Sequence, residues 1–300
     1  MASCVVCPLC SEPGHLETAT EVAEVQCHVR RLQERSFKVW RCTGCNSLHS
    51  GDAADLAFFY SHYPLQNHRL DFHARIGYGN RLRMLRKRGL QPDDRILDYG
   101  CGTGVFLEFL RLKGYRNAFG FDAFVSKYSD PSVLESQYDV VVSYDVIEHV
   151  DDPAQLMRTF TGLVRKGGLL AIGTPNADQI SLKRTQPAEI ELSQPYHRHI
   201  LSERVLVELA KDHGFDVEHI YRRFYFDSLY PAVNTRFMWA YILGGGGMID
   251  VAVEPPQVGR VLRSPRLLFY AFFGYFFPPR GNMLASFRCN RPAGQDEAGS

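Results

Sequence analysis

The sequence predicts an α/β fold, with a mostly parallel sheet carrying helices on both faces, preceded by a small cysteine-rich module. From residue 94 onward, short apolar runs rich in β-branched residues alternate with helix-like segments, as they do in βαβ units. The first of these runs ends in a glycine-rich turn at 98–104 that opens a helix-like segment. The module is predicted because six of the eight cysteines precede residue 46.

Helix-capping and helix-ending residues indicate where individual helices begin and end. Asp151 and Asp152 are capping candidates for the helix that starts at Pro153, while Ser202 and Gly214 bound another. Helices are expected at 54–63, 73–89, 104–114, 153–168 and 202–215, and strands at 95–99, 117–122, 138–147, 169–176, 216–226 and 283–289.

The chain has 300 residues, which suits one large domain and a small module. We expect a module at 1–52, a helical linker or lid at 53–92, a main domain at 93–290 with an insertion at about 227–280, and a disordered tail at 291–300. The insertion breaks the alternation with four consecutive glycines, 244–247, and many aromatic residues. This glycine run predicts a turn or hinge, because no Lys-Ser/Thr pair follows it as in a phosphate-binding loop.

The 34 basic and 33 acidic residues leave a net charge of +1, which gives no general attraction to nucleic acid or anionic membranes. One basic cluster is interpreted as a solvated helix face: Arg81, Arg83, Arg86, Lys87 and Arg88. The N-terminus lacks the pattern of a signal peptide, so a cytoplasmic protein with reduced thiols is expected. The apolar segment within 266–278 is too short to span a bilayer, and peripheral membrane contact through it stays open.

Three glycines, Gly100, Gly102 and Gly104, alternate directly after a predicted strand. Without a Cβ, they allow positive φ and let a ligand press against the backbone. The helix expected to begin at about Thr103 adds free N–H groups and a partial positive charge. The loop therefore suits a nucleoside-containing ligand at the carboxyl end of the sheet.

The pattern around this loop is D-x-G-x-G-x-G, which differs from the dinucleotide fingerprint because Val105 stands where that fingerprint requires glycine. Asp98, ahead of the glycines, can face a cationic amino group. Asp122 closes the next strand, where an acid can accept both ribose hydroxyls. A ligand with an ammonium, a sulfonium and an adenosine therefore fits better than one with two phosphates.

Four stretches in order, "LDYGCGTG", "GFD", "YDVVVSYDVIEHVDDP" and "VRKGGLLAIGTPN", resemble the class I S-adenosylmethionine-dependent methyltransferases, in the branch with an "IEHV" segment that methylates small molecules. The resemblance covers about residues 75–225. It implies a Rossmann-like sheet and methyl transfer from S-adenosylmethionine. By position it implies that Asp98, Gly100, Gly102 and Gly104 hold the methionine part, that Asp122 holds the ribose, and that Ser143, Tyr144 and Asp145 line the floor near the sulfonium.

One departure from the family concerns the segment 123–137 between Asp122 and Tyr138. It is too short for the helix and third strand that the family usually places there. The acid that contacts adenine therefore has no secure counterpart, and Asp130 is the best candidate.

Two C-x-x-C pairs, Cys7 with Cys10 and Cys42 with Cys45, can complete a closed tetrahedral Zn²⁺ site, and they predict that the module at 1–52 is a small zinc ribbon. Such a site is structural and takes no part in chemistry. Cys4 forms a third C-x-x-C with Cys7, and Cys27 and His28 are alternative ligands. Scattered buried thiols and a redox pair are the competing interpretations. Some sugar methyltransferases of the resembled family begin with a similar module followed by an aromatic helix like "FFYSHY".

Methyl transfer to a hydroxyl or a carbon acid also needs a proton acceptor. His149 in "IEHV" and His197 in "PYHRH" are the candidates, because the ordinary pKa of histidine suits proton transfer near neutrality. Glu148 is interpreted as a buttress of the loop, and either histidine can instead serve only as a structural hydrogen-bond partner. The aromatic residues of 224–241 either shape an apolar acceptor pocket or pack the insertion onto the sheet.

The predicted function is methyl transfer to a small-molecule acceptor, such as a saccharide, a quinone-like compound or a lipid-linked precursor. An RNA methyltransferase is one alternative, against which the near-zero net charge counts. A non-catalytic binding protein that keeps the methyltransferase fold is the other, permitted by the shortened segment 123–137.

Overall fold

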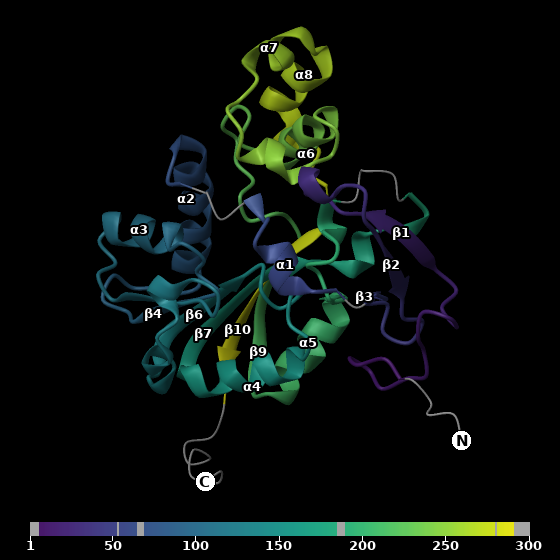
Figure 1. Ribbon diagram of the computed structural model, residues 1–300. Helices are drawn as coiled ribbons and strands as arrows, with labels where there is room; N and C mark the ends of the chain where they lie inside the picture. Colours follow the sequence, from purple (N-terminus) through teal and green to yellow (C-terminus); the bar gives the residue numbers. More distant parts are fainter. Residues whose placement is uncertain (1–5, 53, 65–68, 185–189, 280, 291–300) are drawn as a thin grey trace.

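The computed structural model describes residues 6–52, 54–64, 69–184, 190–279 and 281–290. Its centre is a six-stranded sheet in the order β5-β4-β6-β7-β10-β9, covered by helices (Figure 1). The strands are β4 (Ile96–Tyr99), β5 (Ala118–Phe121), β6 (Tyr138–Tyr144), β7 (Val164–Pro175), β9 (Phe215–Tyr221) and β10 (Asn282–Cys289). β4 to β7 are parallel, and β10 lies antiparallel between β7 and β9. The predicted α/β class is confirmed.

Successive strand residues point to opposite faces of the sheet, and helices cover both faces. Side chains on both faces are therefore buried. Leu97, Val141 and Leu170 belong to the core beneath α4 (Pro153–Leu163) and α5 (Glu203–Asp212). Ile96, Val140 and Leu169 belong to the core beneath α2 (Phe72–Lys87) and α3 (Val105–Leu112). These strands therefore read as continuous apolar runs rather than as alternating ones.

The caps predicted at Asp152 and Ser202 are confirmed, whereas several element boundaries shift, as in the strand predicted at 138–147, which ends at Tyr144. Asp152 accepts a hydrogen bond from the Gln155 amide at the start of α4, and Ser202 caps α5. The helix predicted at 153–168 ends at Leu163, because the buried Val164 already pairs with Tyr138 in the sheet. The strand predicted at 216–226 ends at Tyr221, so that residues 222–226 leave the sheet.

The segment between β5 and β6 contains only two short 3₁₀ helices, η3 (Ser126–Tyr128) and η4 (Pro131–Glu135). No strand pairs with the outer side of β5 in the part of the chain that the structure describes. The prediction that this segment is too short for a helix and a further strand is confirmed. β5 is consequently an edge strand.

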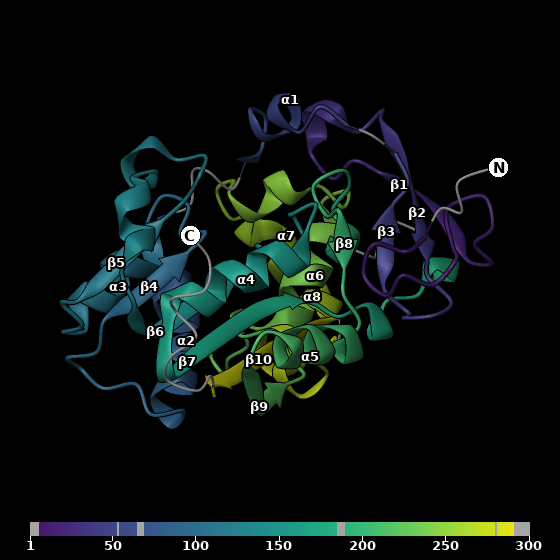
Figure 2. The same ribbon diagram turned by 90° about the horizontal axis from the view of Figure 1, so that it is seen from below.

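The N-terminal module is built on a second, antiparallel sheet beside the large one (Figure 2). Its strands β1 (Val22–Gln26), β2 (Ser36–Arg41) and β3 (Leu48–Ser50) are followed by β8 (His199–Ile200), which belongs to the main domain. The short helix α1 (Leu56–Tyr60) then leads from the module to α2. The two parts of the chain therefore share one sheet.

The insertion between β9 and β10 consists mainly of three helices that project away from the large sheet, at the top of Figure 1. They are α6 (Thr235–Gly244), α7 (Val258–Arg263) and α8 (Pro265–Phe273). Across the described residues, none of the helices has the length and apolar character needed to span a bilayer.

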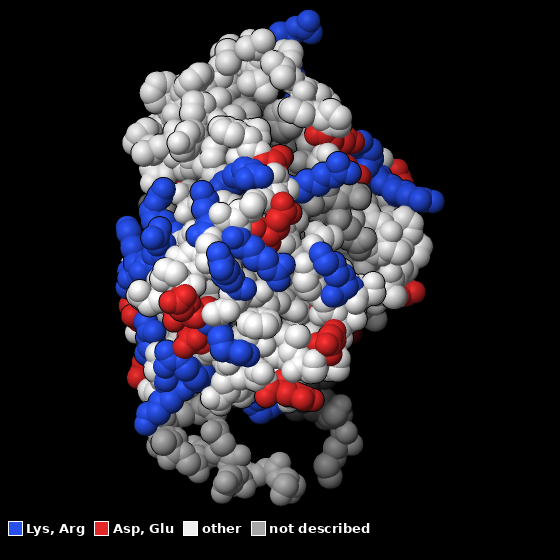
Figure 3. Space-filling model, turned by 90° about the vertical axis from the view of Figure 1, so that its left-hand side faces the viewer, with Lys and Arg blue, Asp and Glu red and all other residues white. Residues whose placement is uncertain are grey.

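The predicted solvated cluster on α2 is wrong for one member. Arg83, Arg86 and Lys87 are exposed, and basic side chains are common over this side of the molecule (Figure 3). Arg81, in contrast, is buried.

Candidate functional site

The glycine loop connects β4 to α3, which begins at Val105 with Gly104 as its N-cap. All three glycines are left-handed, with φ of 80° at Gly100, 52° at Gly102 and 82° at Gly104. A Cβ on Gly100 would lie 2.2 Å from Cγ2 of Val146, and one on Gly104 would lie 2.2 Å from the Tyr128 hydroxyl oxygen. The loop therefore requires glycine for its backbone conformation and for the space around it.

The predicted ribose acid, Asp122, holds this loop against the end of β5. One of its carboxylate oxygens accepts the Gly102 amide at 2.8 Å, and the other accepts the amides of Phe124 and Val125 at 2.9 and 3.1 Å. Asp98 lies near the end of β4, and Asp122 directly follows β5, the adjacent parallel strand, so both acids lie at the carboxyl ends of these strands. The structure brings together the residues predicted for the methionine and ribose ends.

The predicted adenine contact, Asp130, has a different setting. Its side chain is exposed and caps η4 by accepting the Ser132 amide at 3.0 Å, and this hydrogen bond lowers the pKa of the carboxyl. The structure thus gives Asp130 a local structural role at the start of η4.

Asp98 is buried at the end of β4. Burial raises the pKa of its carboxyl to about 7, while the positive charge of Arg81 opposes the rise. The carboxyl is therefore poised between its two protonation states near neutral pH.

Arg81 points from α2 into a box of aromatic rings. Its guanidinium carbon lies 4.1 Å from the ring centre of Tyr144, 4.3 Å from Tyr225, 4.9 Å from Phe226 and 5.1 Å from Tyr78. These are cation–π distances, and they position a buried positive charge beside the floor of the site. Its Nε is buried and has no hydrogen-bond partner among the residues that the structure describes.

The sequence contained a signal for the burial of Arg81. Ala74, Tyr78 and Leu85 precede and follow it at helical spacing and are all buried, so position 81 falls on the apolar stripe of α2. A positive charge on such a stripe indicates a site rather than a solvated face.

The predicted floor, Ser143 to Asp145, lies where β6 ends. The Ser143 and Tyr144 hydroxyl oxygens are buried, and within the described part of the chain neither has a hydrogen-bond partner. Asp145 has φ of 55°, in the left-handed region that residues other than glycine seldom adopt, and its carboxylate accepts a hydrogen bond from the Tyr225 hydroxyl. Tyr225 comes from 222–226, the residues that leave the sheet. A strained turn and unpaired buried hydroxyls are typical of ligand sites.

The predicted bases come together with a carboxylate. One ligand atom each of Glu148, His149 and His197 lies within 4.8 Å of the others. His149 Nδ1 is 3.1 Å from the Tyr196 carbonyl oxygen, and His197 Nδ1 donates to the Glu191 carbonyl. A carbonyl oxygen can only accept, so Nδ1 carries the proton and Nε2 keeps its lone pair in each neutral ring.

The electrostatics of this cluster follow from burial. Burial lowers the pKa of His149 to about 4 and also lowers that of His197, so both rings are neutral at pH 7. Glu148 Oε2 accepts a hydrogen bond from the Thr174 hydroxyl at 3.0 Å, whereas its Oε1 is buried without a partner. Burial also raises the pKa of Glu148 well above its ordinary value. The cluster thus presents two imidazole nitrogens and one oxygen of the Glu148 carboxyl group.

The linker contributes an aromatic wall that sequence reasoning missed. The Tyr60 hydroxyl of α1 lies 2.9 Å from His149 Nδ1, and its ring contacts Tyr196 at 5.2 Å and stacks on Phe124 at 5.4 Å. Tyr63 packs on Tyr196 at 4.6 Å. The aromatic residues of 224–241 divide between two sites, since Tyr225 and Phe226 surround Arg81 while Phe237 stacks on Tyr241 inside the insertion.

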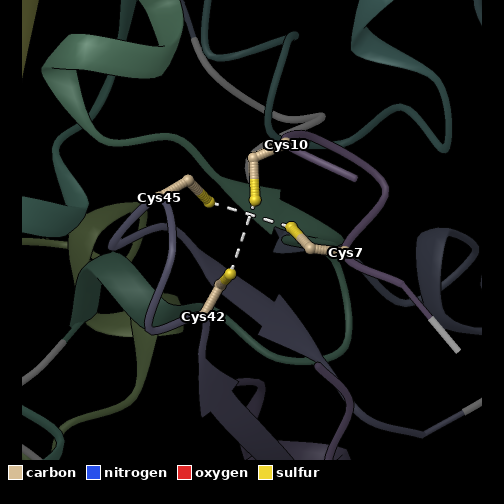
Figure 4. A group of neighbouring side chains, drawn as sticks. All are labelled: Cys7, Cys10, Cys42 and Cys45. Carbon is tan, nitrogen blue, oxygen red and sulfur yellow. Dashed lines mark hydrogen bonds between the residues drawn. The ribbon is translucent and has the colours of Figure 1, made fainter. Parts of the chain in front are cut away.

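The four predicted zinc ligands point toward a common centre (Figure 4). The sulfur atoms of Cys7 and Cys45 are 3.8 Å apart, and those of Cys10 and Cys42 are 3.7 Å apart. Tetrahedral Zn–S bonds of about 2.3 Å place sulfur atoms about 3.8 Å apart, whereas a disulfide would bring them to about 2 Å. The thiols fit a tetrahedral metal site.

Both C-x-x-C pairs lie in equivalent turns. The Ser11 amide donates to the Cys7 carbonyl, and the Asn46 amide donates to the Cys42 carbonyl, each at 2.9 Å. Ser11 and Asn46 are both left-handed, with φ of 60° and 64°. Of the alternative ligands, Cys4 lies outside the described residues. Cys27 packs in a separate core, and neither it nor His28 belongs to the group of four.

The cysteine site is fastened to the main domain by hydrogen bonds. The Ser202 hydroxyl donates to the Cys45 carbonyl at 2.7 Å, and the Ser202 amide donates to the Ser47 hydroxyl at 3.0 Å. Arg204 donates to the Gly44 carbonyl at 2.8 Å. These hydrogen bonds connect the second cysteine turn to the start of α5. His197 lies five residues before Ser202 in the sequence.

Comparison with known proteins finds similarity to methyltransferases over the part of the chain that contains the glycine loop. Residues 72–220 match a family described as a methyltransferase domain. A probable S-adenosylmethionine-dependent methyltransferase of Mycolicibacterium smegmatis is 36% identical over 84 residues, 28% of this chain and 31% of that protein. A second one, from Mycobacterium tuberculosis, is 36% identical over 137 residues, 40% of this chain and 48% of that protein.

A third relative is a ubiquinone biosynthesis O-methyltransferase of Aeromonas salmonicida, 33% identical over 104 residues. This match covers 27% of the present chain and 43% of the relative. The chain spans less than half the length of each of these three curated relatives.

Proposed function

We propose that this chain belongs to the class I S-adenosylmethionine-dependent methyltransferases, that it binds S-adenosylmethionine at the glycine loop, and that it transfers the methyl group to a small-molecule acceptor. The observation that carries the proposal is the set of three left-handed glycines between Asp98 and Asp122. An ammonium can meet Asp98 while the ribose hydroxyls meet Asp122, so the loop needs no phosphate group in its ligand.

Arg81 completes the recognition of the methionine part in this proposal. The cofactor carries a carboxylate beside its ammonium, and Arg81 is a buried cation with an unpaired Nε and opposes the pKa rise of Asp98. A pair of opposite charges in the site matches the two charges of the amino acid end. Ser143, Tyr144 and Asp145 would line the floor, and adenine would lie toward η3 and η4, with Asp130 as its acidic neighbour.

Arg81→Met is expected to weaken binding of S-adenosylhomocysteine about 10- to 150-fold, because a hydrogen bond to a charged group contributes about 1.5–3 kcal/mol. Isothermal titration calorimetry measures this change. Arg83→Met is the matched control, since Arg83 is exposed on the same helix and donates to Asn80. Equal affinity of a folded Arg81→Met protein and the control would contradict the proposed role.

For the acceptor side, we propose that Glu148, His149 and His197 hold a divalent cation. The residues fit one, because a buried carboxylate oxygen lacks a partner and both histidines are fixed through Nδ1, as metal-bound histidines usually are. A cation there would polarise an acceptor oxygen and ease its deprotonation. The alternative needs no metal. In it, His149 or His197 accepts the proton of the acceptor directly.

Manganese binding separates these two mechanisms. We expect the protein to take up one Mn²⁺, measured as loss of the free-ion signal in electron paramagnetic resonance, and Glu148→Gln or His197→Ala to abolish this uptake. The cysteine site does not compete, because thiolates prefer softer metals. His213→Ala is a control, since His213 bonds the Leu209 carbonyl at the end of α5 and does not belong to this cluster. No Mn²⁺ uptake by the folded protein would favour direct proton transfer.

The wall beside His149 indicates the kind of acceptor. Tyr60, Tyr63, Tyr196 and Phe124 are aromatic, and Phe124 is 82% exposed at the rim. Rings of this kind favour an acceptor with a flat or apolar portion next to the oxygen that is methylated. Among the predicted classes, a quinone-like compound or a sugar attached to a lipid fits this wall best.

A further inference from the structure

The outer side of the insertion is unusually apolar. Six large residues of α7, α8 and the turn after α8, which we call the outer aromatic face, are between 47% and 64% exposed: Leu262, Phe269, Phe272, Phe273, Phe276 and Phe277. The Phe269 ring contacts those of Phe273 at 5.3 Å and Phe277 at 5.8 Å. The aromatic residues therefore form a connected surface rather than scattered exposed side chains.

The periodicity of α8 is the reverse of that of a helix that faces water. Phe269, Phe272, Phe273 and Phe276 follow the helical spacing i, i+3, i+4 and i+7 and all point outward. The inner side carries Leu267, Ala271 and Gly274, of which two are small. A Cβ on Gly274 would lie 2.2 Å from Oδ1 of Asn234, so the helix packs closely inward with its small residues. The large residues are thus turned outward by the packing of the insertion itself.

The charged residues in the part of the sequence that contains this face are all basic. From residue 255 to residue 289 the sequence contains no Asp or Glu, and its charged residues are five arginines. Arg263 and Arg266 are exposed on α7 and α8 next to the aromatic residues. The face lies at the far end of the molecule in Figure 1, and the same end is mostly white in Figure 3.

We propose that the outer aromatic face docks onto an anionic lipid bilayer and inserts its phenylalanines into the interfacial layer. Apolar residues flanked by arginine are the composition of interfacial segments, in which aromatic rings enter the headgroup boundary and cations meet anionic lipids. A second copy of the chain fits less well, because two such faces would bring arginines together with no carboxylate in 255–289 to pair with them. This docking does not depend on the proposed methyl transfer.

Co-sedimentation with vesicles tests the docking. The full chain is expected to sediment with phosphatidylglycerol vesicles and much less with phosphatidylcholine vesicles, and added salt should weaken the binding. Phe272→Asp with Phe276→Asp should reduce the partition coefficient at least tenfold. Leu112→Asp is the matched control, since Leu112 is 59% exposed on α3, outside the outer aromatic face, and should leave vesicle binding unchanged.

Two further measurements keep the outcomes distinct. Calorimetry with S-adenosylhomocysteine should give the same affinity for the double variant as for the unaltered chain, so that vesicle binding and cofactor binding fail separately. Folded protein that ignores phosphatidylglycerol vesicles would overturn the proposal. A dimer in analytical ultracentrifugation that the double variant loses, without vesicle binding, would assign the face to a second copy instead.

Discussion

Replacing Cys42 by alanine is expected to abolish metal binding by the four thiols, unfold the N-terminal module and lower the melting temperature of the whole chain. Structural zinc sites of this kind contribute about 10–16 kcal/mol of apparent binding free energy, which becomes folding free energy. Loss of even about 4 kcal/mol corresponds to roughly 8–16 °C in a domain of about 150–250 residues. Differential scanning calorimetry and metal analysis by mass spectrometry measure the two effects.

The control for this prediction is Cys27→Ala. Cys27 is fully buried in the same module but does not belong to the group of four sulfur atoms. Its truncation removes one buried sulfur atom, so the metal content should stay unchanged and the melting temperature should fall only slightly. If Cys42→Ala kept the metal and the melting temperature of the unaltered chain, the four thiols would not be a structural metal site.

Asp98→Asn is expected to separate stability from cofactor binding by changing them in opposite directions. The asparagine keeps the shape of the side chain and removes a buried negative charge, so the melting temperature should stay equal or rise. Binding of S-adenosylmethionine should weaken by about tenfold or more, because the ammonium loses its charged partner. Calorimetry gives both quantities, and retained affinity in the variant would refute the role of Asp98.

The same residue gives the binding a pH dependence with a defined sign. Burial raises the pKa of Asp98 to about 7, so the carboxyl of the unliganded protein is mostly protonated below that pH. Only the charged form attracts the ammonium, and affinity should therefore rise with pH up to about 7 and then level off. The stability of the unliganded protein should change oppositely. It should decrease from about pH 4 to about pH 7, because over this range the unfolded chain has lost the proton of this carboxyl while the folded protein still holds it, and it should level off above about pH 7. Asp98→Asn should abolish both trends.

Local chemistry made much of the fold predictable. Asp152, Ser202 and the alternating glycines act through their immediate neighbours, and these signals persist in the sequence. The boundary at Val164 was missed because a helix and a buried strand follow each other without a turn, so tertiary pairing with Tyr138 decides where the strand begins. Such pairing has no local signature.

The site was less predictable than the fold, because it is assembled from distant segments. His149 meets Tyr60 across 89 positions and lies in one cluster with His197, which no spacing rule indicates. Arg81 was misread because charge was counted along the chain rather than around the helix. Tyr225 likewise reaches Asp145 only because the chain leaves the sheet after Tyr221.

The pairing of β3 with β8 also bears on how the protein can be cut. A recombinant fragment that begins after residue 52 would lose β3, leaving β8 as an unpaired edge and His199 without its ring contact to His49. It would also lose Cys45 and Ser47, the partners of Ser202 at the start of α5. The boundary predicted after residue 52 is therefore not a suitable start for a recombinant fragment. Structural or functional studies need the chain with its cysteine module attached.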